Sequence, residues 1–197
     1  MAILRKIDLL TVLAVFGLAL SACIPEGPIA NPNPTTGVAA TPASPVATPT
    51  VGGAVVPTWG QRTKISGCVG VDVRPDPACT PGDILTVTKD DICTPGYSSG
   101  VRNVPESVKN QVYAEYGIPS HNPGQYEVDH FVSLELGGSN DISNLWPEPA
   151  SPKPGFHEKD KVENYLHDQV CSGAMTLGEA QLKIATNWLE VYNSLPK

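Results

Sequence analysis

Residues 126–149 contain the side chains whose types and spacing best suit chemistry. Asp129 and His130 are adjacent in an apolar, strand-like run, a pair of glycines follows, and Asn144 lies fourteen residues after His130. Hydrolysis of a phosphodiester needs a base for the attacking water, positive charge at the phosphate and help for the departing oxygen. Histidine is well suited to accept a proton near neutral pH, and a carboxylate is a hard ligand for ions such as Mg²⁺. The residues therefore indicate His130 as the base and Asp129 as a metal ligand.

The supporting residues have more than one interpretation. An imidazole works as a base when its other nitrogen is held by a hydrogen bond, and we assign that contact to the amide of Asn144. Asn144 could instead bond its own backbone, and Gly137-Gly138 could be only a hairpin turn. Neighbours on a regular strand point to opposite faces, so Asp129 and His130 reach one phosphate only if the strand is distorted. We therefore expect a bulge at this pair.

Over residues 126–168 the chain resembles HNH-type, or ββα-metal, endonucleases. Many of these motifs share the Asp-His pair, the glycine turn and an Asn fourteen residues after the His, as found here. The family then places a His or Asn early on a helix as the last metal ligand. The first suitable residue is His157, thirteen residues after Asn144 where the family often has nine, and Asn164 is the second choice. The resemblance implies catalysis by His130 and Asn144, with Mg²⁺, or alternatively Mn²⁺, Ca²⁺ or Zn²⁺, held by Asp129 and His157.

The elements that would position this site follow from periodicity and stop signals. The strand and turn are followed by a helix predicted at 156–170, with Gly173 as its stop. Further helices are predicted at 105–116 and 176–195, and a short strand at 84–88. The expected fold class is α+β: a small ββα-metal hairpin-plus-helix core with additional helices and a loop-rich, disulfide-stapled N-terminal part.

The N-terminal third of the chain predicts export. A basic pair precedes a short apolar stretch, and small residues then lead to Cys23, as in a bacterial lipoprotein signal peptide over residues 1–22. An ordinary secretory signal is the alternative. Residues 23–58 are rich in Pro, Thr and Ala and predict a tether with no packed core. We expect Cys23 to carry a lipid that anchors the domain, residues 59–197, to a membrane of the bacterial envelope, facing away from the cytoplasm.

Cysteine usage agrees with an exported domain. Four cysteines remain after Cys23, and in an exported chain they favour two disulfides with three possible pairings. A zinc cluster is the alternative, but no Cys-x-x-Cys motif supports it. We expect Cys171, at the end of the helix beginning at 156, to be tied to the N-terminal loops. The candidates are Cys68, Cys79, Cys93 and Cys171.

The charge limits how nucleic acid could be bound. With a net charge of −7, the chain lacks the basic surface of most DNA-binding domains. Its binding to nucleic acid should therefore be weak and non-specific. A local basic patch is expected from Arg102, Lys153, Lys159 and Lys161. We expect a monomeric, surface-anchored, metal-dependent nuclease acting on extracellular DNA or RNA. The alternatives are a non-catalytic envelope lipoprotein that uses the ββα scaffold for binding, and a hydrolase of another phosphate ester.

Overall fold

The computed structural model describes residues 50–51, 54–55 and 57–196. The predicted signal peptide, Cys23 and most of the tether lie outside these residues. Two short strands, β1 (Thr50–Val51) and β2 (Ala54–Val55), form an antiparallel pair at the start of the described chain. No helix in the described part of the chain is long and apolar enough to cross a membrane.

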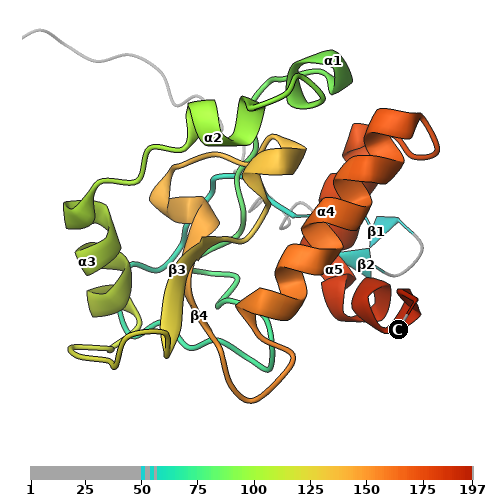
Figure 1. Cartoon of the computed structure of the whole chain (residues 1–197). Helices are drawn as coiled ribbons and strands as arrows, with labels where there is room; N and C mark the ends of the chain where they lie inside the picture. Colours follow the sequence, from blue (N-terminus) through green and yellow to red (C-terminus); the bar gives the residue numbers. More distant parts are fainter. Residues whose placement is uncertain (1–49, 52–53, 56, 197) are drawn as a thin grey trace, which may run out of the picture. The chain divides into compact units, whose positions relative to one another are not determined.

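A second antiparallel sheet lies at the centre of the domain (Figure 1) and consists of β3 (Tyr126–His130) and β4 (Leu145–Pro149). The two strands pair one for one along their whole length. The predicted bulge is therefore wrong for these strands. As a result, Asp129 and His130 keep the opposite orientations of neighbours on a regular strand.

The connection between β3 and β4 is longer than a hairpin turn. It contains two short 3₁₀ helices, η1 (Leu134–Leu136) and η2 (Ile142–Asn144). Gly137 ends η1 in the left-handed region with φ 75°. A Cβ on the next residue, Gly138, would lie 1.8 Å from the Val132 carbonyl oxygen, so only glycine allows this close approach. The two glycines thus fold the connection back on itself rather than joining the strands directly.

Two long antiparallel helices, α4 (Phe156–Ser172) and α5 (Leu177–Ser194), cover one side of the hairpin. α4 begins and ends close to the predicted positions, because Gly173 adopts φ 82° and stops it. A capping box between Thr176 and Glu179 starts α5. The buried side chains at helical spacing on the two helices form much of the hydrophobic core, with members Val162, Leu166, Val170, Ala180, Ile184 and Trp188.

Three shorter helices complete the domain: α1 (Lys89–Ile92), α2 (Tyr97–Val101) and α3 (Glu106–Glu115). The strand predicted at 84–88 is not formed, since Ile84 makes only an isolated bridge to Gly138. Thr88 instead caps α1 through a reciprocal pair of bonds with Asp91. The helix predicted at 105–116 is α3, which begins just after Pro105. The predicted α+β class is confirmed.

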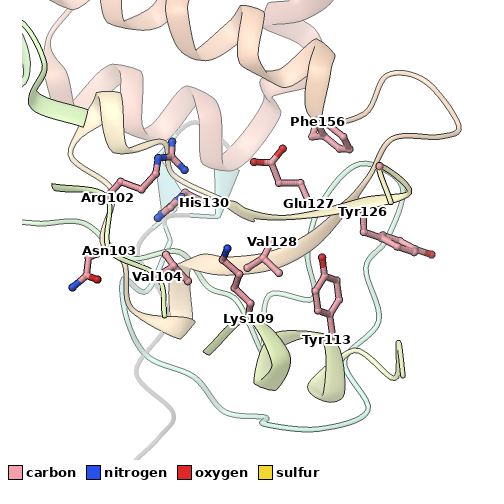
Figure 2. A pocket seen from close by; sticks show the side chains of 11 residues that line it. Arg102, Asn103, Val104, Lys109, Tyr113, Tyr126, Glu127, Val128, His130 and Phe156 are labelled. Carbon is pink, nitrogen blue, oxygen red and sulfur yellow. The ribbon is translucent and has the colours of Figure 1, made fainter. Parts of the chain in front are cut away.

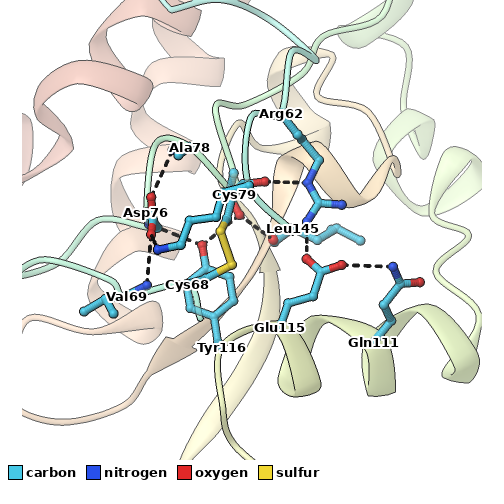
Figure 3. Close-up of a disulfide and its surroundings, with 12 residues drawn as sticks. Arg62, Cys68, Val69, Asp76, Ala78, Cys79, Gln111, Glu115, Tyr116 and Leu145 are labelled. Atoms are coloured by element: carbon cyan, nitrogen blue, oxygen red, sulfur yellow. Dashed lines mark hydrogen bonds and ion pairs between the residues drawn. A yellow bond between two sulfur atoms is a disulfide. The ribbon is translucent and has the colours of Figure 1, made fainter. Parts of the chain in front are cut away.

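Two disulfides join the loop-rich N-terminal part to itself and to α4. Cys68 is bonded to Cys79, and Cys93 to Cys171, which confirms the predicted link from the end of α4 to the N-terminal loops. Figure 3 shows that the first disulfide lies within a polar network. Arg62 donates to the Cys79 carbonyl at 2.7 Å and also pairs with Glu115 of α3. The irregular segment is therefore held by covalent and polar links where regular secondary structure is sparse.

The two disulfides should contribute unequally to stability. They close loops with sequence separations of 78 and 11 residues, and the entropy removed from the unfolded chain grows with loop length. We expect serine at Cys93 and Cys171 to lower the free energy of unfolding by about 4 kcal/mol, against about 3 kcal/mol for Cys68 and Cys79. Urea unfolding of the two double variants measures both values, and the reverse order would contradict this account.

Candidate active site

A cavity of about 630 Å³ opens beside β3 and α3 (Figure 2). The segment after α2 forms a further wall. The cavity combines two cations, a carboxylate, an imidazole and aromatic rings. Its principal lining residues are Arg102, Lys109, Glu127, His130, Tyr113, Tyr126 and Phe156. Such a mixture of charged and aromatic groups in a concave surface is typical of a ligand-binding site.

The imidazole of His130 is held in one tautomer. Its Nε2 lies 3.1 Å from Oδ1 of Asn140. The Asn140 amide has a fixed orientation, because its Nδ2 donates to the Val101 carbonyl at 2.8 Å and its Oδ1 accepts from the Asn103 backbone N–H at 3.2 Å. Since Oδ1 can only accept, the neutral imidazole carries its proton on Nε2. The lone pair is then on Nδ1, which is the atom able to act as a base.

Its surroundings keep His130 neutral. The residue is only 2% exposed, and this burial lowers the pKa of His130 to about 4, with the positive charges of Arg102 and Lys159 adding to the effect. The hydrogen bond to Asn140 and the charge of Asp129 act in the opposite direction but do not outweigh burial. At neutral pH the imidazole is therefore able to accept a proton.

Asn144 does not contact the ring of His130. Its Oδ1 accepts from the backbone N–H groups of Val132, at 2.8 Å, and Asp83, at 3.3 Å. Its Nδ2 donates to the carbonyls of Val132 and Ser139 at 2.9 and 2.8 Å. These four bonds use the full capacity of the amide, so the predicted contact is made by Asn140 instead. Both asparagines follow the glycine pair in sequence, and nothing local distinguishes their roles.

Asp129 points to the buried side of α4 and is not among the residues that line the cavity. Its Oδ1 accepts from the His130 backbone N–H at 2.7 Å, and its Oδ2 accepts from Nζ of Lys159 at 2.8 Å. The fully buried ammonium also donates to the His130 carbonyl at 2.9 Å and to Glu163, and lies 3.8 Å from Glu148. We call Lys159 with Asp129, Glu148 and Glu163 the lysine cage.

The protonation of the cage follows from burial and charge. Burial disfavours a charged Lys159, but the neighbouring carboxylates raise its pKa well above the ordinary value. Burial likewise opposes ionisation of Asp129, yet the Lys159 charge holds the pKa of that carboxyl below its ordinary value. Burial raises the pKa of Glu163 to about 7 and that of Glu148 well above its ordinary range. The cage is thus centred on the Lys159–Asp129 ion pair.

The three predicted metal ligands do not form a pre-formed metal-binding site. Both oxygens of Asp129 already accept hydrogen bonds, so an ion there would have to displace Lys159. His157 lies exposed in the first turn of α4. Asn164 is also exposed, and its Nδ2 donates to the Asp160 carbonyl of its own helix at 2.6 Å. The donor set nominated from the sequence therefore does not fit a divalent ion in this arrangement.

A different group could hold a metal ion. The ligand atoms of Cys93, His167 and Cys171 all lie within 4.8 Å of one another. His167 and Cys171 are one helical turn apart on α4, which is the local Cys/His signal that the sequence analysis overlooked. Thiolates are the ligand form of cysteine, and here the two sulfurs are joined in a disulfide. They would be available to an ion only after reduction.

The predicted basic patch is also rearranged. Lys159 is buried in the cage, and Lys153 pairs with Glu158 at 3.1 Å. Arg102 does line the cavity, where it is joined by Lys109 of α3, which sequence reasoning did not single out. Glu127 faces the same cavity, and partial burial together with the charges of Asp129 and Asp160 raises its pKa. The cavity therefore carries two cations beside one acid whose pKa is raised.

No protein-family model, curated protein or solved structure matches this chain. The likeness to HNH endonucleases thus depends on the motif residues, and function has to be inferred from the geometry of the cavity.

Proposed function

We propose that this protein is a phosphodiester hydrolase of HNH type that cleaves nucleic acid without sequence specificity. One observation carries the proposal: the neutral imidazole of His130, oriented by Asn140, lines a cavity that also presents Arg102 and Lys109. A general base and cations directed at one concave site are what hydrolysis of a phosphate ester requires.

The residues of the cavity suit the steps of the reaction. Nδ1 of His130 takes a proton from a water molecule, whose oxygen forms the new bond to phosphorus. Arg102 and Lys109 bind the non-bridging oxygens and offset the charge that develops on them. As the bond to the departing oxygen breaks, Glu127 donates a proton to that oxygen, a role supported by its raised pKa.

The resemblance further implies a divalent ion, with Mg²⁺ as the first choice and Mn²⁺, Ca²⁺ or Zn²⁺ as alternatives. We assign no step to the ion, because both Asp129 oxygens are already engaged. Export is part of the same proposal. The two disulfides are compatible with an oxidising compartment, and a lipid on Cys23 would keep the monomeric domain at the envelope surface.

The direct test is cleavage by the oxidised full chain of DNA and RNA, first after chelation and then with each ion returned. Cleavage in any arm supports the hydrolase, and the difference between arms gives its dependence on the ion. Folded protein that cleaves no nucleic acid with any ion would contradict the proposal and favour a binding module.

The pH profile should identify the base. Below its pKa of about 4, His130 is protonated and cannot accept a proton, so kcat/KM should fall only below about pH 4. On the alkaline side, the rate should fall as Glu127 loses its proton through its raised pKa. Steady-state rates measured from about pH 3.5 to about 9 test both limbs of the profile. An acid limb at the ordinary histidine pKa of 6.5 would contradict the assignment.

The folded fraction must be measured at each pH in that experiment. The unfolded chain protonates His130 near its ordinary pKa of 6.5, whereas the folded chain does so only at about 4. The unfolded state therefore binds the proton first, and the His130 contribution to stability is lost as pH falls through this window.

A further inference from the structure

Three aromatic rings gather near the cavity. The Tyr113 ring of α3 lies 4.3 Å from the ring of His121 with an interplanar angle of 35°, and Tyr126 meets His121 edge-on at 6.1 Å. We call these three residues the aromatic cluster. Figure 2 shows Tyr113 and Tyr126 together, away from the end of the cavity that holds Arg102 and His130. The two tyrosines are half-buried and His121 is exposed, so all three rings have accessible surface that a ligand could contact.

The cavity has room beside this cluster. Gly124 lines the cavity two residues before Tyr126, and a Cβ placed on it would meet no atom within 4 Å. Tyr113 also follows Lys109 by one helical turn on α3, so the ring and the cation share one face of that helix. The cavity could therefore bind a single ligand that places a planar group against the rings and an anion against the cations.

Charge indicates which form of nucleic acid suits this arrangement. A duplex is bound mainly through many phosphate contacts, but this chain has a net charge of −7 and its cavity has two principal cations. Unpaired bases can instead stack on aromatic rings, which contributes roughly 1–3 kcal/mol per base and needs no basic surface. The bases of an intact duplex are already stacked on one another and cannot reach the rings.

We propose that the substrate is unpaired nucleic acid, with a base on the aromatic cluster and the neighbouring phosphate between His130, Arg102 and Lys109. The identification of the phosphate as the reacting group depends on the proposed function; the identification of the bound strand does not. Single-stranded DNA and RNA share this chemistry. Binding should depend less on salt than binding to a basic surface does, because the salt dependence follows the number of phosphates neutralised and the cavity presents only Arg102 and Lys109.

Binding is measured by fluorescence anisotropy with the full chain carrying His130→Ala, which removes the proposed base. The ligands are a labelled single-stranded 12-mer of roughly one-site length, the same sequence as a duplex, and a strand with abasic positions. We expect the single strand to bind at least about 10-fold more tightly than either other ligand. The abasic strand keeps the phosphates and loses the bases, so it tests stacking without any change in the protein.

Variants at the cluster supply the matched comparison. Tyr126→Ala should weaken binding of the single strand by roughly 5- to 100-fold, whereas Tyr126→Phe retains the ring and should retain most of the affinity. Tyr165→Ala, at a partly exposed tyrosine of α4 outside the cavity lining, is the control. Equal binding of duplex and single strand, or no effect of Tyr126→Ala, would overturn the inference.

The same set of ligands separates this inference from the proposed function. If the wild-type chain binds the single strand selectively but cleaves nothing, the hydrolase proposal fails and the binding inference stands. If it cleaves a duplex as fast as a single strand, the hydrolase stands and the inference of an unpaired substrate fails.

Discussion

Replacement of His130 by alanine is expected to lower kcat for nucleic-acid cleavage by roughly 10²- to 10⁴-fold, the usual contribution of a general base. The physical reason is that Nδ1 of His130 is the base assigned to the attacking water, while Nε2 is committed to Asn140 at 3.1 Å. Single-turnover cleavage measures the effect, with near-UV circular dichroism to show that the variant is folded. A folded His130→Ala protein with the wild-type rate would show that the base lies elsewhere.

Variants at the two asparagines provide the control for this assignment. Asn140→Asp keeps an acceptor for Nε2 and adds a negative charge that favours the imidazolium, so the acid limb of the pH profile should move upward. Asn144→Asp should leave that limb in place and reduce stability, because Asn144 bonds only the main chain. His157→Ala tests the remaining ligand assignment, since an essential ion held there would make the variant inactive.

Replacement of Lys159 by methionine should lower the free energy of unfolding by about 3–5 kcal/mol. The ammonium is fully buried and bonds Asp129, Glu163 and the His130 carbonyl. Methionine preserves much of the volume but leaves the carboxylates without their buried partner. Urea unfolding measures the loss. Lys161→Met, at an exposed position two residues along α4, should change stability by no more than about 0.5 kcal/mol. Similar losses in both variants would contradict the role of the cage.

The cage also predicts the direction of a pH effect. Glu163 has a folded pKa of about 7 against an ordinary value of 4.5, so the unfolded state loses this proton first as pH rises. Its contribution to stability is therefore lost between about pH 4.5 and 7. The Lys159 charge lowers the pKa of Glu163. Without that charge, the pH range over which the Glu163 contribution is lost should extend to higher pH. The Lys159→Met deficit should consequently be larger at alkaline pH than at acid pH.

Local sequence signals were sufficient for the three longer helices, α3, α4 and α5, but not for the short helices α1 and α2 or for the site. α4 ends where Gly173 adopts its left-handed conformation, and that requirement is local. The strand predicted at 84–88 is not formed, because a strand needs a second strand to pair with and Ile84 makes only an isolated bridge to Gly138. The choice between Asn140 and Asn144 depended on the path of the connection after β3, which no pattern in the sequence specifies.

The lysine cage could have been predicted in part. Lys159 shares the buried face of α4 with Val162 and Leu166, three and seven residues further on. Helical spacing therefore already placed this lysine among core positions, where a charge needs a partner. The sequence could not supply the identity of those partners, because Asp129 and Glu148 lie on β3 and β4, and the periodicity of α4 does not indicate which strand residues face it.

The links around Cys68 and Cys79 have a mechanical consequence (Figure 3). If the chain is anchored through Cys23, thermal motion of the domain against its tether pulls on the N-terminal end of the folded part. That force first meets the pairing of β1 with β2, then the hydrogen bond from the Gly60 N–H to the Gly82 carbonyl, then the pairing of Arg62 with Glu115, and then the disulfide. These links lie ahead of β3 along the chain. A pull on the tether is therefore resisted before it can distort the strand that carries His130.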